Sequence, residues 1–169
     1  SEDVKATLEA LVDPKTPATV YAGTGDFHGG SGYSLGIMKS TDGGATWTNY
    51  GRAQFGNTAV SQVLVDPDNT DIVTVTTGRG AAYYGKVYRS TDGGETWNTA
   101  INVSATWSDA DFGAKSGSNR TYYAAAEGRI YRSTDNGANW SSVALPSGAS
   151  FGGTVDVAAS KIDAATVYV

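Results

Sequence analysis

Short runs of β-branched and aromatic residues alternate along the chain with segments rich in Gly, Pro, Asp and Asn. This pattern is typical of β-strands joined by tight turns. Within residues 1–50 it predicts four strands, at about 7–13, 19–24, 35–40 and 45–50. No apolar period of the kind that marks an amphipathic helix persists along the sequence, so we expect an all-β chain.

One octapeptide occurs three times. Residues 40–47 (STDGGATW) return as 90–97 (STDGGETW) and as 133–140 (STDNGANW), at spacings of 50 and 43 residues. The flanks repeat as well, since Val-Asp-Pro precedes the first two copies at 12–14 and 65–67. Periods of this length are typical of propeller blades and solenoids.

Each repeat reads as a unit of four short strands, A to D. The units span about 1–50, 51–100 and 101–146, and an incomplete fourth unit occupies 147–169. The Gly-Gly or Asn-Gly pair in each octapeptide supplies the positive-φ residues that a tight hairpin between strands C and D requires. Residues 1–169 are therefore interpreted as a single domain of repeated units.

The octapeptide has the chemistry of a folding device. Its Ser and Asp side chains can accept hydrogen bonds from N–H groups across the turn, and its Trp can pack between neighbouring sheets. A functional reading would make Asp42, Asp92 and Asp135 calcium ligands or catalytic acids, but three equivalent turns in three units cannot converge on one site. The residues given the structural role are Ser40, Asp42, Gly44, Trp47, Ser90, Asp92, Gly94, Trp97, Ser133, Asp135, Gly137 and Trp140.

These octapeptides resemble the Asp-box (BNR) repeat of sialidases, xyloglucan-cleaving glycosidases, sortilin-like receptor domains and many secreted bacterial proteins. The resemblance covers essentially the whole chain, through phrases such as TVYAGTG and GKVYRSTDGGETW. It implies a β-propeller of four-stranded antiparallel blades, of which about three and a half are present. It also implies a secreted or cell-surface protein, with the Asp boxes on one rim and ligands bound on the opposite face.

The face opposite the Asp boxes should be formed by the B–C and D–A connections, because neighbouring strands alternate in direction. We expect these connections at about 25–34, 78–85, 51–59 and 101–106. Exposed aromatic rings beside polar side chains suit sugars, whose C–H faces stack on flat rings. Phe55, Tyr84 and Trp107 have the alternative role of filling the space between blades. The candidate ligand-binding residues are Phe27, His28, Tyr33, Arg79, Tyr83 and Tyr84.

Composition narrows the classes of partner. The 12 Lys and Arg residues are dispersed and outnumbered by 17 Asp and Glu, so we expect no nucleic-acid partner. There is no Cys for a disulfide, and no run approaches the roughly 18 apolar residues of a membrane span. His28 has no second His or Cys at ligand spacing, so we expect neither a metal site nor a cofactor.

Hydrolysis of a glycosidic bond usually needs two carboxyl groups about 5–10 Å apart. Asp26 is the one clear candidate on the proposed face, because Glu127 lies in a tight turn and Asp109 and Asp111 lie within a strand. Three hypotheses remain open. The chain recognises an extracellular glycan or protein, or belongs to a xyloglucanase-like or sialidase-like hydrolase whose active site lies partly outside these residues, or is a structural repeat that self-associates.

The number of units leaves the predicted ring open, because propellers usually close with 4–8 blades. Exposed blade faces and unpaired strand edges favour association. We therefore expect either that copies of the chain complete one another or that the remainder of a longer chain completes the ring.

Overall fold

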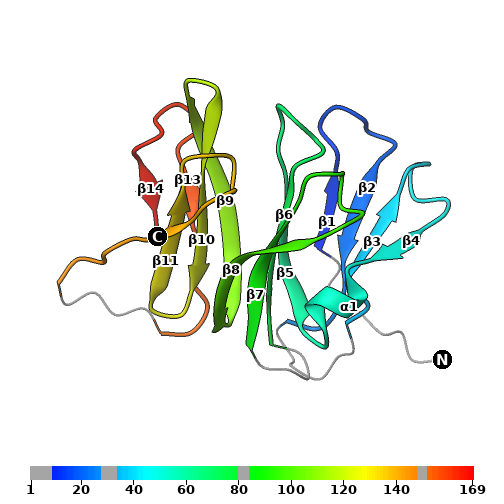
Figure 1. Ribbon diagram of the computed structural model, residues 1–169, viewed down its shortest axis with the longest axis horizontal. Coiled ribbons are helices and arrows are strands. Elements are labelled where there is room, and N and C mark those ends of the chain that lie inside the picture. Colours follow the sequence, from blue (N-terminus) through cyan, green and yellow to red (C-terminus); the bar gives the residue numbers. More distant parts are fainter. Residues whose placement is uncertain (1–8, 28–33, 80–83, 148–151) are drawn as a thin grey trace.

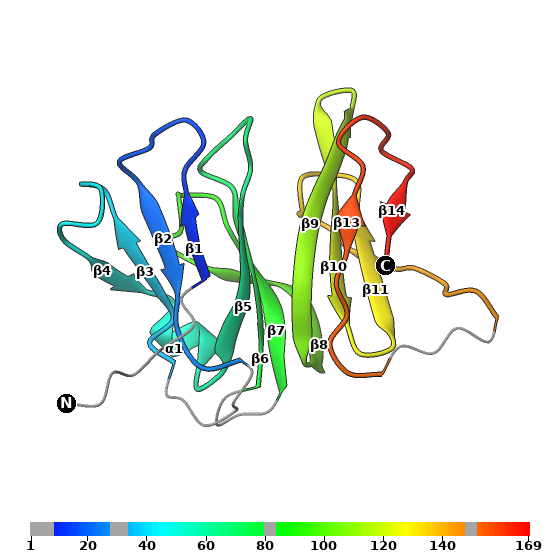
Figure 2. The ribbon, with the colours of Figure 1, turned by 180° about the vertical axis from the view of Figure 1, so that it is seen from behind.

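Three four-stranded antiparallel sheets and one two-stranded sheet lie side by side in the computed structural model (Figures 1 and 2). The structure describes residues 9–27, 34–79, 84–147 and 152–169. In each four-stranded sheet, every strand is hydrogen-bonded to the next strand along the chain. The chain is therefore a partial β-propeller, as the sequence predicts.

The sheets are the blades of this propeller, numbered here in chain order. Blade 1 contains β1 (Glu9–Val12), β2 (Val20–Gly23), β3 (Ile37–Ser40) and β4 (Thr48–Tyr50). Blade 2 contains β5 (Ala59–Val65), β6 (Val73–Gly78), β7 (Tyr84–Ser90) and β8 (Asn98–Ala105). Blade 3 contains β9 (Trp107–Ser116), β10 (Asn119–Ala126), β11 (Arg129–Ser133) and β12 (Ser141–Ser142). Blade 4 contains β13 (Ala158–Ala159) and β14 (Val167–Tyr168).

Three details differ from the sequence-based prediction. The connection after β4 contains a short helix, α1 (Arg52–Phe55), which buries the Phe55 ring. The loop expected at 101–106 is mostly strand, since β8 runs to Ala105 and β9 begins at Trp107. The fourth strand of blades 1, 2 and 3 begins directly after the Trp of the octapeptide rather than before it. The hydrogen bonds of the turn extend to the Trp side chain in blades 1 and 3.

The Asp-box turn is a local hydrogen-bond network that is nearly identical in its three copies. In blade 2 the Ser90 hydroxyl donates to the Asp92 carboxylate at 2.7 Å and accepts from the Gly94 N–H at 2.8 Å. The Asp92 carboxylate also accepts from the N–H and hydroxyl of Thr96, at 2.9 and 2.5 Å. The first and third copies repeat these bonds, with Asn139 in the place of Thr96 in the third. The Ser and Asp side chains thus bind N–H groups of their own turn.

These bonds also change the acidity of the carboxyl groups. Hydrogen bonds from the hydroxyl and N–H of Thr46 lower the pKa of Asp42 to about 2. Burial acts to raise the pKa of Asp92, but the hydrogen bonds from Thr96 and Ser90 outweigh it and bring that pKa to about 2 as well. Both carboxyl groups are therefore ionised wherever the turn is formed at neutral pH.

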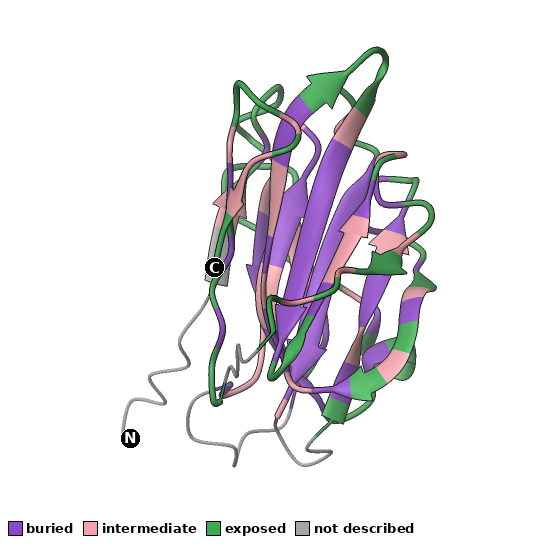
Figure 3. Cartoon of the chain, turned by 90° about the vertical axis from the view of Figure 1, so that its left-hand side faces the viewer, coloured by how far each residue is buried: buried purple, intermediate pink, exposed green. Residues whose placement is uncertain are grey.

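Neighbouring blades pack face to face through apolar side chains. Three clusters join the blades in succession, and they contain Tyr21, Phe55 and Trp97, then Val87, Trp107 and Tyr122, then Tyr123, Ile130 and Val157. Figure 3 shows this burial along the strands, with exposed residues concentrated in the turns. Phe55 and Trp107 are buried, as the space-filling alternative predicts.

Blade 4 is held to β9 by side chains that bind backbone groups. The Ser108 hydroxyl donates to the Val155 carbonyl at 2.6 Å. The carboxylates of Asp109 and Asp111 accept from the N–H groups of Val157 and Ala159, at 2.8 and 2.9 Å. The two strand carboxylates therefore fix the position of the next blade.

Replacing Ser90 by Ala is expected to reduce the free energy of unfolding by about 1–3 kcal/mol, because Ser90 is buried and the Gly94 N–H and the Asp92 carboxylate both lose a partner. Urea unfolding of the chain measures this change. Thr91→Ala, at the exposed neighbouring position, is the matched control and should change stability by no more than about 0.5 kcal/mol. Equal losses in the two variants would contradict the role of the Ser90 hydroxyl.

Acid is expected to destabilise the Asp-box turns. A carboxyl group with a lowered folded-state pKa contributes stability that is complete above its unfolded pKa of about 4 and is lost as pH falls through its folded pKa. For Asp42 and Asp92 the lower end of this window is at about pH 2. Calorimetry from pH 6 to pH 2 should show the Tm falling across this window, and falling less in Asp92→Asn. The same dependence of Tm on pH in the wild type and in Asp92→Asn would contradict this explanation.

Candidate functional site

The B–C and D–A connections of the blades gather on one face, which we term the loop face (Figure 1). It comprises α1, the residues that follow β2 and β6, the junction of β8 with β9, and the turn between β10 and β11. The Asp-box turns join β3 to β4, β7 to β8 and β11 to β12, and so lie at the opposite ends of the strands. One end of the propeller is thus built from a repeated turn and the other from connections that differ between blades.

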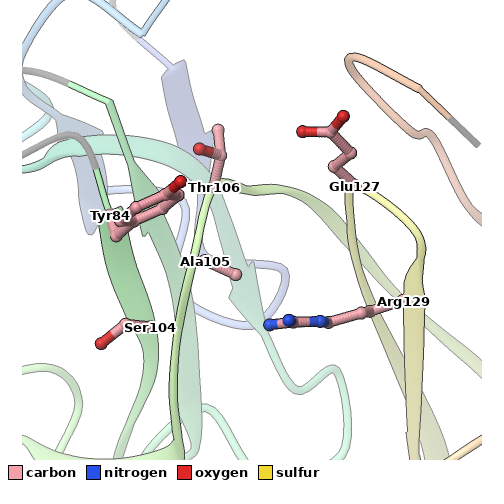
Figure 4. Close-up of a pocket in the computed structure, with 6 residues that line it drawn as sticks. All are labelled: Tyr84, Ser104, Ala105, Thr106, Glu127 and Arg129. Atoms are coloured by element: carbon pink, nitrogen blue, oxygen red, sulfur yellow. The ribbon is translucent and has the colours of Figure 1, made fainter.

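A pocket of about 460 Å³ opens on the loop face between blades 2 and 3 (Figure 4). The start of β7, the end of β8 and the β10–β11 turn form its walls. The residues that line it are Tyr84, Ser104, Ala105, Thr106, Glu127 and Arg129. The pocket therefore combines an aromatic ring with three hydroxyl groups, that of the Tyr included, and one charge of each sign.

The pairing of β6 with β7 places Tyr84 at the rim of this pocket. The register shifts between Thr76 and Gly78, and the Thr77 hydroxyl bonds to the N–H and the carbonyl of Lys86, at 3.0 Å each. A Cβ atom at position 85 would collide with Thr77, so the close approach of the two strands requires Gly85. Tyr84 stands at the end of this tightly paired segment with 61% of its surface exposed.

Glu127 and Arg129 flank Gly128 in the β10–β11 turn, where Gly128 has a φ of 66°. The Arg129 side chain extends toward Ala105, and the Glu127 carboxylate lies nearer to Thr106 (Figure 4). Neither side chain takes part in any ion pair found among the described residues. The two charges therefore remain open to hydrogen bonds from a molecule in the pocket.

Phe27 and Arg79, both predicted to bind a ligand, contact each other. Phe27 is only 7% exposed, and the Arg79 guanidinium lies 5.2 Å from the centre of its ring. Arg79 has a φ of 52°, which is uncommon for a residue other than Gly. The pair connects the first B–C connection to the second, with the Phe27 ring covered. Asp26, the candidate acid, is half-buried beside Phe27.

The structure thus brings Tyr84 alone, of the described candidates, into the pocket. His28, Tyr33 and Tyr83 lie outside the described residues. Sequence reasoning does not single out Ser104, Thr106 and Arg129. The D–A connection at 101–106 is a predicted part of the face, but nothing in the sequence shows that it lies opposite the next B–C turn.

Two further classes of site were considered for the residues that the structure describes. No three His, Cys, Asp or Glu side chains among them gather closely enough to hold a metal ion. Within the same ranges, no helix has the length and apolar character needed to cross a membrane.

Sequence comparison identifies the repeat. The BNR/Asp-box repeat family matches residues 88–99 and 131–142, which contain the whole of the second and third octapeptides. No curated protein is significantly similar to the chain. The chain therefore carries BNR/Asp-box repeats on a partial β-propeller.

Structural comparison finds enzymes built on propellers. The chain is similar to the GH74 enzyme of Niastella koreensis, with 28% identity and a TM-score of 0.56 over 81% of this chain and 22% of that one. It is similar in fold to the GH74 xyloglucanase of Xanthomonas campestris, with 17% identity and a TM-score of 0.55 over 85% and 23%. YCF48 bound to D1 peptide aligns with 17% identity and a TM-score of 0.49 over 80% and 42%.

The chain spans less than a quarter of the two GH74 structures. Together with the repeats, the similarity defines the class of this protein. It is an Asp-box propeller segment related to the propellers of glycoside hydrolases.

Proposed function

We propose that this propeller segment recognises a polysaccharide, and that the pocket between blades 2 and 3 holds one or two of its sugar rings. The observation that carries the proposal is the pocket itself, in which an exposed Tyr84 ring stands beside polar groups from two blades. Its volume of about 460 Å³ lies within the range of small-molecule sites.

The lining residues suit a sugar better than an apolar ligand. The exposed surface of the pocket is more polar than apolar. The Tyr84 ring offers a flat surface to the C–H groups of a pyranose, while the Ser104 and Thr106 hydroxyls can donate and accept hydrogen bonds. Glu127 can accept hydrogen bonds from sugar hydroxyl groups, and Arg129 can donate hydrogen bonds to sugar oxygens. Side chains from both blades can therefore bind an uncharged sugar.

Xyloglucan is the first ligand to test, because one of the similar structures is a xyloglucanase. The same similarity supports action outside the cell, where the chain would meet such a polymer. The recognition surface then belongs to a secreted or cell-surface protein.

Tyr84→Ala is expected to reduce the affinity for xyloglucan oligosaccharides about tenfold, because the loss of ring stacking costs about 1.4 kcal/mol. Isothermal titration calorimetry measures the Kd. Tyr84→Phe, which keeps the ring, should bind within threefold of the wild type. Glu127→Gln should weaken binding, whereas Glu95→Gln, on the Asp-box side, should not. Wild-type affinity in Tyr84→Ala, or no binding across a panel of polysaccharides, would count against the proposal.

A second candidate function is hydrolysis of the same polymer, which the similarity to GH74 enzymes favours. Burial raises the pKa of Asp109, as in a general acid, but its carboxylate accepts from the Val157 N–H and holds blade 4. On the described part of the loop face, the acidic side chains of the B–C connections are Asp26 and Glu127. In this alternative Asp26 supplies one carboxyl group of an active site whose partner lies outside these residues.

If the chain hydrolyses xyloglucan, Asp26→Asn is expected to lower kcat at least 100-fold and leave the Kd for oligosaccharides within threefold. Release of reducing ends measures kcat, and calorimetry measures the Kd. Full activity in Asp26→Asn removes this residue from the mechanism, and absence of turnover by the wild-type chain removes hydrolysis as a function of these residues alone.

A further inference from the structure

The third Asp box differs from the other two at its fourth residue. Gly43 and Gly93 occupy this position in the first two copies, and Asn136 occupies it in the third. Their φ angles are 70°, 66° and 58°, a left-handed conformation that Asn adopts more readily than most residues with a side chain. Asn136 is followed by Gly137, and no other Asn of the sequence precedes a Gly. The third turn therefore contains an Asn-Gly pair.

The Asn136 side chain joins this turn to the hairpin formed by β9 and β10. Its Oδ1 atom accepts a hydrogen bond from the Arg120 N–H at 2.6 Å, and its Nδ2 atom donates to Asn119 Oδ1 at 3.3 Å. Asn119 and Arg120 are the first two residues of β10. A Gly has no side chain to make these bonds, so the Asn holds the third box to its own blade at two additional points.

The main chain of the same pair is bonded both within the turn and to the preceding blade. The Asn136 carbonyl accepts from the Arg89 Nε of blade 2 at 2.9 Å. The Gly137 N–H donates to the Ser133 hydroxyl at 3.0 Å, and the Gly137 carbonyl accepts from the Trp140 indole N–H at 2.9 Å. A chemical change in this stretch of main chain therefore acts on the turn and on the contact between blades 2 and 3 together.

An Asn-Gly pair can rearrange without an enzyme, and Gly favours the reaction because it has no side chain to hinder the approach. The main-chain nitrogen of the Gly loses its proton to a base in the solvent and attacks the side-chain carbonyl carbon of the Asn. The bond from that carbon to Nδ2 breaks, ammonia leaves, and a succinimide ring closes. Water then opens the ring at either carbonyl. Opening at Cγ gives Asp, and opening at the main-chain carbonyl gives isoaspartate, whose main chain runs through Cβ and is longer by a methylene group.

The folded turn protects both reacting groups. Gly137 is buried and its nitrogen shares its proton with the Ser133 hydroxyl, so a base in the solvent does not reach it. The side-chain amide of Asn136 is held at its oxygen by Arg120 and at its nitrogen by Asn119. Attack therefore requires that the turn first opens locally.

The first two boxes contain Asp-Gly pairs, at residues 42–43 and 92–93, which can form the same ring. The carboxyl groups of Asp42 and Asp92 are ionised at neutral pH. An ionised carboxylate repels a deprotonated nitrogen, whereas the amide of Asn136 is neutral. The third box is thus the reactive copy.

We propose that Asn136 is a site of deamidation that the third Asp box controls. The closed turn prevents the reaction, and local opening of the turn permits it. Conversion to isoaspartate lengthens the main chain of the turn and displaces the carbonyl that Arg89 binds, so the modification weakens the contact between blades 2 and 3. It leaves a permanent chemical mark on chains whose third turn has opened.

Ser133→Ala removes the partner of the Gly137 N–H, and Ser90→Ala, the equivalent change in the second box, is the matched control. The folded proteins are incubated at mildly alkaline pH and digested with trypsin, and mass spectrometry with fragmentation measures deamidation at Asn136 in the fragment 133–161. The rate is expected to rise at least about tenfold in Ser133→Ala and less than threefold in Ser90→Ala, because the population with an open third turn sets the rate.

The wild-type chain unfolded in urea supplies the unprotected rate, and it keeps the test decisive if Ser133→Ala does not fold. Folded wild type is expected to react at least about 100-fold more slowly than the chain in urea, because the turn is closed in most molecules. Equal rates in folded and unfolded wild type overturn the proposal, and so does equal acceleration in Ser133→Ala and Ser90→Ala.

The effect of the modification is measured on the isoaspartate form, separated from unmodified protein by ion-exchange chromatography. Its Tm is expected to lie at least about 4 °C below that of the unmodified chain. Asn136→Asp, which has the new charge but the ordinary main chain, should lose less. Asn136→Gly, which has the residue of the other two boxes, should keep its Tm through the same incubation. An isoaspartate form with the Tm of the unmodified chain overturns the proposed effect on the contact between blades.

Discussion

The hydrogen-bonded turn of the Asp box connects local order with the arrangement of whole blades. Ser90 and Asp92 satisfy the N–H groups of their turn from inside, so the shape of the hairpin does not depend on solvent or on a neighbouring blade. The carbonyl of Gly93 then faces outward and receives the Tyr21 hydroxyl of the preceding blade. Because the same turn is repeated, the same contact is repeated, and each blade is placed relative to the last by a small number of fixed donors and acceptors.

The connections at the opposite end of the strands are not part of this repeated turn, so their sequences and shapes can differ between blades. The loop face contains a short helix after β4, a tightly paired strand start at Gly85 and a two-residue turn around Gly128. In the part of the chain that the structure describes, none of these elements repeats between blades, so the side chains they present are not constrained by the repeat. Binding sites are commonly built on connections held by a rigid scaffold, and the pocket at Tyr84 lies among such connections.

The repeat explains why the fold was predictable from the sequence while the site was not. The octapeptide and its flanks define strand order and blade type, because turn chemistry and strand periodicity are local properties. Tyr84 was identified by its place in a B–C connection. Ser104 and Arg129 were missed because they lie on different blades and line the same pocket only where those blades meet. No local sequence pattern indicates which residues of two blades come together. Phe27 has the sequence context of an exposed ring, yet it is buried and the Arg79 guanidinium lies over its face.

The pocket at Tyr84 lies at the contact between blades 2 and 3. Blades 2 and 3 are complete and each has a packed neighbour on both sides, so the pocket at Tyr84 is formed without any further blade. The outer faces carry the side chains that inner contacts bury: Trp47 is 40% exposed and Trp97 only 6%. The pocket at Tyr84 is lined by residues of blades 2 and 3 and of the junction between them, so the recognition proposed for it depends on contacts that these two blades make with one another.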